Sequence, residues 1–205
     1  MPVVDGREYR SFNMALTAVD PIEGEDEGSL IVEGYATTFD DPYELYPGYY
    51  EVIDRHALEG ADMSDVIMQL NHEGAPLARQ RNGSLAIMCD DHGLFMRANL
   101  NGCKTSEEVH RQIKSGLIDR MSWGFIIAED GYEYDSETRT STITKVSKVF
   151  DVSAVSRPAN EGTEIHARSY FDGVIEAERQ ELAQRVEKDE RDRRKSKFLF
   201  ETGGM

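Results

Sequence analysis

Three polar residues in otherwise apolar segments are of the types that carry out acyl transfer. His72 ends an apolar run, Ser122 lies among large apolar residues, and Asp151 follows a phenylalanine and precedes a valine. In such a set, His72 would accept the Ser122 proton and later donate it to the leaving amine. Asp151 would hold the imidazole tautomer and stabilise the imidazolium. This combination occurs in several chain orders on unrelated folds, so spacing alone does not prove a triad.

Each of these residues also has a plain structural explanation. A serine within a strand is often a small residue beneath a packed neighbour, although Gly124 on the same face would leave room for a scissile carbonyl. His72 has the features of an ordinary turn histidine, and Asp151 those of an outward-facing edge residue. Ser153 is the alternative nucleophile, without a flanking glycine. The residues alone therefore leave the assignment open.

Metal and disulfide chemistry are poorly supported. The five histidines show neither the HxH nor the HxxxH spacing of zinc sites, which makes a metal-dependent hydrolase a weak hypothesis. Cys89 and Cys103 lack CxxC spacing and are expected to be reduced thiols. We therefore expect no metal and no other cofactor.

Charge and hydropathy limit the partners. The net charge of −16 argues against a nucleic-acid surface, because phosphate binding requires clustered lysine and arginine. No apolar run approaches the roughly 20 residues of a membrane span, and the N-terminus lacks a signal pattern. We expect neither nucleic acid nor membrane as a partner, and a protein that acts where it is made.

The candidate residues lie on elements that are mostly strands. Glu108 has capping-box spacing from Thr105, apolar residues continue to Leu117, and Gly116 is a helix stop, which predicts one helix over 105–117. Polar residues 129–141 suggest a loop or a loose hairpin. The period-two and compact apolar segments predict strands at 29–39, 66–70, 85–89, 94–100, 119–128, 142–146 and 149–155.

Three regions follow from the composition of the 205 residues. Residues 1–28 form a peripheral N-terminal segment, and residues 29–168 form the main domain. Acid-before-base pairs at i,i+4 predict a charged helical tail over 169–205. The expected fold class is β-rich (α+β), an antiparallel β-barrel or strongly curved sheet with at least one packed helix.

Four segments in order, covering about residues 30–168, resemble the prohead maturation serine proteases of tailed bacteriophages. They are 33–36 with Phe39, 70–73, 116–125 and 150–160. No single segment is decisive, but the ordered set is fairly specific. The sequence departs from many relatives in having Ala78 before Arg79, where glycine is usual, and Trp123, where phenylalanine is frequent. Both changes could alter a substrate cleft.

The resemblance implies a fold and a site. The fold would be similar to that of the herpesvirus maturation protease, assemblin, a β-barrel surrounded by helices. The family's catalytic histidine falls on His72 and its serine on Ser122. The third member varies: herpesvirus enzymes use a second histidine, whereas the phage group places an acid in the strand that here carries Asp151. Backbone N–H groups near Arg157 would form the oxyanion hole.

The implied function is procapsid maturation. In that group the protease is packaged inside the procapsid in the host cytoplasm, where it can self-associate. It cleaves the scaffold or the scaffolding segment of the major capsid protein, and commonly itself, before DNA packaging. The charged tail would dock on scaffold or be removed by self-cleavage. The alternative is a non-enzymatic assembly or scaffold protein, or an inactive protease relative, which the acidity and charged tail also fit.

Overall fold

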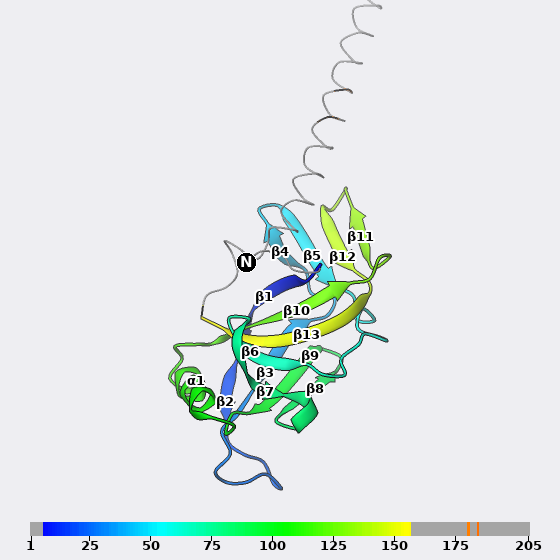
Figure 1. The fold of residues 1–205 in the computed structure, drawn as a ribbon. Coiled ribbons are helices and arrows are strands. Elements are labelled where there is room, and N and C mark those ends of the chain that lie inside the picture. Colours follow the sequence, from blue (N-terminus) through cyan, green and yellow to red (C-terminus); the bar gives the residue numbers. More distant parts are fainter. Residues whose placement is uncertain (1–5, 157–179, 181–183, 185–205) are drawn as a thin grey trace, which may run out of the picture. The chain divides into compact units, whose positions relative to one another are not determined.

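The computed structural model describes residues 6–156 and the single positions 180 and 184 (Figure 1). Residues 1–164 form one unit and residues 165–205 another. Every element below belongs to the first unit. The expected helical tail, apart from two positions, and the segment near Arg157 lie outside the described residues.

Strands dominate the described part of the chain, as expected for a β-rich protein. The elements are β1 (Glu8–Ala15), β2 (Thr17–Val19), β3 (Ile31–Thr38), β4 (Tyr43–Tyr46), β5 (Tyr49–Ile53), β6 (Ile67–Leu70), β7 (Glu73–Arg79), the 3₁₀ turn η1 (Gln80–Asn82), β8 (Leu85–Cys89), β9 (Gly93–Asn99), α1 (Lys104–Lys114), β10 (Arg120–Ile127), β11 (Tyr132–Asp135), β12 (Thr140–Ile143) and β13 (Val146–Val155).

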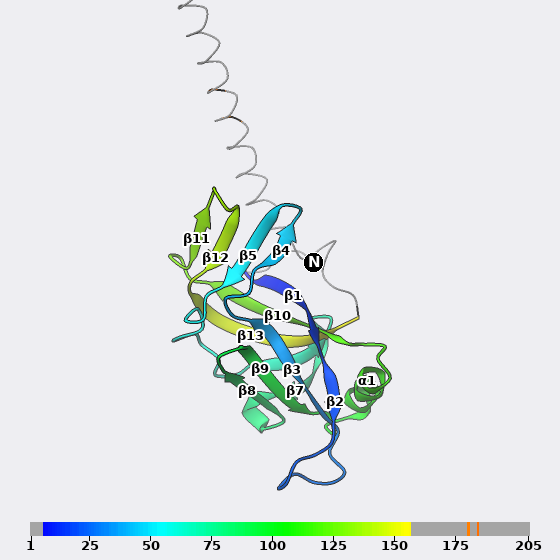
Figure 2. The ribbon, with the colours of Figure 1, turned by 180° about the vertical axis from the view of Figure 1, so that it is seen from behind.

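The strands form three sheets, with the orders β1-β10-β13-β6-β7, β2-β3-β9-β8 and β11-β12-β5-β4. Figures 1 and 2 show β10 and β13 crossing over β3 and β9, with the third sheet projecting from one end. None of these sheets closes into a barrel, so the expected barrel is not confirmed. Most strand pairs are antiparallel, as expected, but β13 pairs with β6, and β12 with β5, in parallel.

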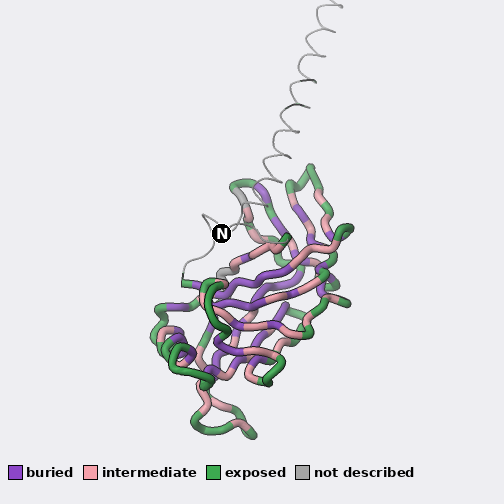
Figure 3. Tube along the Cα trace, in the orientation of Figure 1, coloured by how far each residue is buried: buried purple, intermediate pink, exposed green. Residues whose placement is uncertain are grey.

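The core lies where the first two sheets face each other, and β10 runs through its centre. Residues 121–125 of β10 are all buried, so this strand is covered on both faces (Figure 3). Trp123 and Phe125 stack with ring centroids 3.9 Å apart, and Met121 is fully buried. Burying each such side chain contributes about 1.5–3 kcal/mol. The core therefore holds β10, including position 122, in a fixed place.

The helix is shorter than predicted. It begins after Cys103, which is its N-cap in an extended conformation and makes no side-chain capping hydrogen bond, so the expected capping box at Thr105 is wrong. Gly116 has a φ of 74°, which only glycine adopts readily, and it follows the helix end as predicted. Leu117 lies beyond that end and is exposed. Among the described residues, no helix is long and apolar enough to cross a membrane.

Several strands lie outside the predicted ones: β1, β2, β4, β5 and β7. Glu8–Ala15, within the segment expected to be peripheral, pairs with β10 as the edge strand β1 of the central sheet. Residues 129–141, predicted as a loop or a loose hairpin, include Tyr132–Asp135, which forms β11 and pairs antiparallel with β12, so the hairpin is observed. Strand β1 bears on the candidate site, because it borders the strand that carries Ser122.

Candidate active site

The structure brings the three predicted residues together. His72 lies in the turn between β6 and β7, Ser122 on β10 and Asp151 on β13. His72 Nδ1 is 2.5 Å from Asp151 Oδ1, and His72 Nε2 is 2.6 Å from Ser122 Oγ. Two strands and one turn thus contribute a chain of hydrogen-bonded groups in the order serine, histidine, aspartate.

The chemistry of the groups sets the direction of these hydrogen bonds. An ionised carboxylate only accepts, so the Nδ1 proton of neutral His72 points to Asp151. The opposite ring atom, Nε2, then carries a lone pair and faces the Ser122 hydroxyl, which can donate to it. This is the tautomer that a general base requires.

A two-residue hairpin turn presents His72 to the strands. Leu70 pairs with Glu73, and the two residues between them both have positive φ, 54° for Asn71 and 58° for His72. Two consecutive residues of this kind make a type I′ turn, which favours Asn-Gly. Asn71 suits its position, whereas His72 occupies the place that glycine would take most readily. The imidazole is therefore held there at a conformational cost of about 1 kcal/mol.

The same turn is tied to β13, the strand of Asp151. The Asn71 amide N–H donates to the Ala154 carbonyl at 2.9 Å. Asn71 Oδ1 accepts from the Ser156 backbone N–H at 3.0 Å. Because β6 also pairs with β13, the histidine and the carboxylate are carried by one rigid assembly.

Glycine and alanine at position 72 should separate this backbone cost from the loss of the imidazole. Both variants lose the contacts with Asp151 and Ser122, so they should be equally inactive. His72→Gly should be more stable than His72→Ala by about 1 kcal/mol, because alanine is strained at positive φ. Urea unfolding of the two variants measures the difference. Equal midpoints would show that the turn is not strained in solution.

Cross-strand pairing places further polar groups on the face of Ser122. Ser122 pairs with Ser153, and Gly124 with Asp151. Ser153 Oγ donates to Asp151 Oδ1 at 2.7 Å, and both residues are buried. Ser153, the alternative nucleophile in the sequence analysis, thus donates a hydrogen bond to the Asp151 carboxylate. This bond replaces one that the buried carboxylate would otherwise make with water.

Gly124 is required for a reason that the sequence did not suggest. A Cβ at this position would lie 2.5 Å from Asp151 Oδ2 and 2.9 Å from Tyr9 Cε1. The missing side chain makes room for the Asp151 carboxylate and for Tyr9 of β1. The expectation that it opens the face to a scissile carbonyl is replaced by this packing role.

Gly124→Ala should therefore disturb the carboxylate rather than the nucleophile. The added methyl group must push Asp151 or Tyr9 aside, which we expect to destabilise the fold by about 1–3 kcal/mol. Displacement of Asp151 should lower kcat at least tenfold while KM changes little. Steady-state kinetics and thermal unfolding check both effects, and a variant with unchanged kcat would contradict the close packing.

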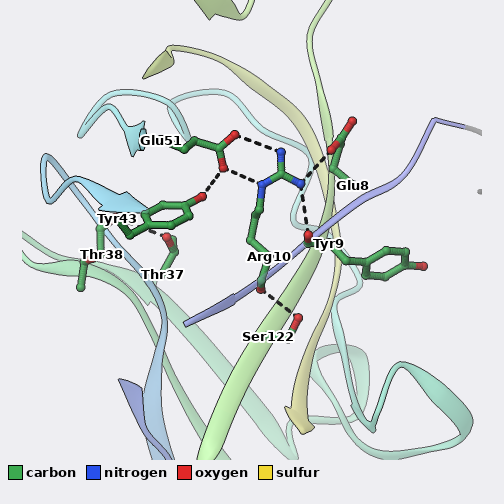
Figure 4. Close-up of polar contacts among 8 residues, drawn as sticks. All are labelled: Glu8, Tyr9, Arg10, Thr37, Thr38, Tyr43, Glu51 and Ser122. Atoms are coloured by element: carbon green, nitrogen blue, oxygen red, sulfur yellow. Dashed lines mark hydrogen bonds and ion pairs between the residues drawn. The ribbon is translucent and has the colours of Figure 1, made fainter. Parts of the chain in front are cut away.

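The edge strand β1 contributes contacts that sequence reasoning missed. The Tyr9 ring packs against His72, with centroids 4.5 Å apart and planes at 60°. Ser122 Oγ also lies 2.8 Å from the Arg10 carbonyl oxygen (Figure 4). The fully buried Ser122 hydroxyl thus has two acceptors within reach, His72 Nε2 and this carbonyl. The hydroxyl has a single proton and donates to one of them at a time, and both contacts are made from the same side-chain rotamer, which lies beside the histidine.

A buried ion pair anchors β1 on its other face. Arg10 Nε lies 2.5 Å and Nη2 3.0 Å from the carboxylate oxygens of Glu51, and the Tyr43 hydroxyl also donates to Glu51 (Figure 4). Burial alone would lower the pKa of Arg10, but the Glu51 carboxylate more than offsets this and holds that pKa well above its ordinary value. The sequence around Arg10 did not predict this ion pair, because Glu51 is 41 positions away.

Other potential chemistry is sparse in the described part of the chain. No group of three or more histidine, cysteine, aspartate or glutamate side chains is placed to hold a metal there. Cys89 and Cys103 are free and exposed. A cavity of about 360 Å³ lies beside the turn between β6 and β7, lined by residues 70, 71, 73–77, 103 and 105.

The chain is similar to known proteins in sequence and in fold. Residues 17–174 match the model of a family described as caudovirus prohead serine protease. The solved structure of the bacteriophage T4 capsid assembly protease, gp21, is similar in fold, with a TM-score of 0.50 and 12% sequence identity. That match covers 74% of this chain and 98% of the T4 chain. No curated protein matches the chain.

Proposed function

Because the chain belongs to the caudovirus prohead serine protease family, we propose that it is a serine endopeptidase with Ser122 as its nucleophile, His72 as its general base and acid, and Asp151 as the residue that orients His72. The observation that supports this proposal best is the unbroken hydrogen-bonded chain from Ser122 through His72 to Asp151. Family and fold likeness by themselves support a protease of capsid maturation.

The geometry suits two-step acyl transfer. Ser122 Oγ attacks the scissile carbonyl while its proton passes to His72 Nε2 over the 2.6 Å contact. The imidazolium that forms is stabilised by Asp151, whose carboxylate lies 2.5 Å from Nδ1. His72 then donates the proton to the leaving amine, and a water molecule repeats the sequence to release the acyl group from Ser122.

The proposed substrates are the scaffold or the scaffolding segment of the major capsid protein, and the enzyme itself, inside the assembling procapsid. The family description and the capsid-assembly role in the name of the T4 protease support this choice. A non-enzymatic assembly protein would not need a histidine held at positive φ between a serine and a carboxylate. The geometry therefore favours the protease over an inactive relative.

Mass spectrometry of the chain co-expressed with its capsid and scaffold proteins tests the proposal. We expect new fragments of a capsid component, self-cleavage products, and a fluorophosphonate adduct on Ser122. Procapsids that assemble with the protein inside but show neither fragments nor adduct would refute it. Because an assembled procapsid raises the local protein concentration, the comparison should include free protein and procapsids.

A further inference from the structure

Three serines lie side by side across the central sheet. Ser11 on β1 pairs with Ser122 on β10, which pairs with Ser153 on β13. Residues directly opposite each other in antiparallel strands point to the same face. Ser153 donates to Asp151, and Ser122 contacts His72 and the Arg10 carbonyl. Ser11 Oγ, in contrast, is buried and has no hydrogen-bond partner among the residues that the structure describes.

Ser11 lies on the side of Ser122 opposite to the strands that carry Asp151 and lead to His72. Asp151 is on β13, and His72 belongs to the hairpin of β6, the next strand beyond β13. Ser11 is on β1, which borders β10 from the opposite edge. Tyr9, two residues before Ser11 and thus on the same face of β1, packs against His72. The side chains on this face of β1 therefore line the catalytic site.

A buried hydroxyl without a hydrogen-bond partner destabilises the fold, and such a group often serves a ligand or a reaction intermediate. Acyl transfer creates such a use, because negative charge develops on the carbonyl oxygen of the substrate. Cβ atoms of directly opposed residues lie about 4.5–5.5 Å apart, and the developing oxyanion is only two bonds from Ser122 Oγ. A hydroxyl on the neighbouring strand can therefore approach the roughly 2.7–3.1 Å at which an oxyanion-hole donor acts.

We propose that Ser11 donates a hydrogen bond to the oxyanion of the tetrahedral intermediate; this inference rests on the proposed function. As the bond from Ser122 Oγ to the carbonyl carbon forms, the serine proton moves to His72 Nε2 and the carbonyl electron pair moves onto oxygen. The Ser11 hydroxyl donates to that oxygen and keeps its proton. When the C=O bond re-forms, the C–N bond breaks and the amine leaves with the proton from His72.

The test compares Ser11→Ala with a matched control, Ser141→Ala. Ser141, on β12 of the third sheet, also carries a buried hydroxyl without a partner among the described residues. Removing either hydroxyl should leave the melting temperature unchanged or slightly higher, since no hydrogen bond is lost. Ser11→Ala should lower kcat and the rate of fluorophosphonate labelling by about 10–100-fold, with KM unchanged. Ser141→Ala should have the kcat and the labelling rate of the wild type.

Two further measurements separate the outcomes. Affinity for a peptide aldehyde, which forms a tetrahedral adduct with the serine, should fall in Ser11→Ala in parallel with kcat/KM. Ser11→Thr, which keeps the hydroxyl, should recover most of the activity. If Ser11→Ala retains the labelling rate of Ser141→Ala within twofold, the Ser11 proposal is wrong even though the protease is active. If the wild-type protein inside procapsids neither cleaves a capsid component nor reacts with the fluorophosphonate, the proposed function is wrong.

Discussion

Ser122→Ala should abolish peptide cleavage, lowering kcat by about 10⁴–10⁶-fold. Removing the nucleophile of a serine protease leaves only the catalysis that comes from substrate binding and oxyanion stabilisation. Among the described residues of the site, only the Ser122 hydroxyl contacts both His72 Nε2 and the Arg10 carbonyl oxygen. Fragment yields from capsid and scaffold proteins, followed over time, measure the loss.

The fold should survive this substitution. Alanine fits the space of a fully buried serine, and the lost hydrogen bond costs about 1–2 kcal/mol. Ser147→Ala, which removes an exposed hydroxyl on the neighbouring strand β13, provides a matched control with near wild-type cleavage. Undiminished cleavage by the folded Ser122→Ala variant would exclude Ser122 as the nucleophile and leave Ser153 as the alternative.

Asp151→Asn should lower kcat by about 10⁴-fold with little change in KM. Asparagine has nearly the same shape, but its amide can donate to His72 Nδ1. The imidazole would then carry its proton on Nε2, facing Ser122, and could no longer accept the serine proton. The effect should be smaller than that of Ser122→Ala, because the nucleophile and the base both remain.

The orientation of the ring provides a check on this mechanism. Nitrogen-15 chemical shifts of His72 should show a proton on Nδ1 in the wild type and on Nε2 in Asp151→Asn. Asp135→Asn, which changes an exposed carboxylate on β11, should alter neither the shifts nor the rate. A normal rate in Asp151→Asn would show that this carboxylate does not orient the base.

Local sequence signals were sufficient for the elements that carry the triad. The expected strands at 66–70 and 119–128 are observed as Ile67–Leu70 and Arg120–Ile127, and His72 lies in the turn directly after the first of them. Large apolar residues around Ser122 indicated a buried strand, and β10 is buried. The triad assignment itself depended on the family resemblance, because a serine, a histidine and an aspartate far apart in sequence do not reveal that they meet.

The sequence did not predict which distant segments pair with each other. Nothing in a period-two pattern tells which strand will be a neighbour, so the parallel pairing of β6 with β13 was missed. The contributions of β1 were missed for the same reason: Tyr9 and Arg10 become informative only when β1 lies beside β10. The role of Gly124 likewise depends on Tyr9 and Asp151, which approach it from opposite strands.

The position of β10 between β1 and β13 also determines how the enzyme should lose activity. Segments paired on both sides and covered on both faces exchange their amide hydrogens only when the whole domain opens. The Ser122 amide should therefore be among the most slowly exchanging of the chain, whereas amides at the exposed start of β7 exchange early. On heating, inactivation should coincide with global unfolding, without an earlier phase in which the nucleophile strand alone becomes disordered.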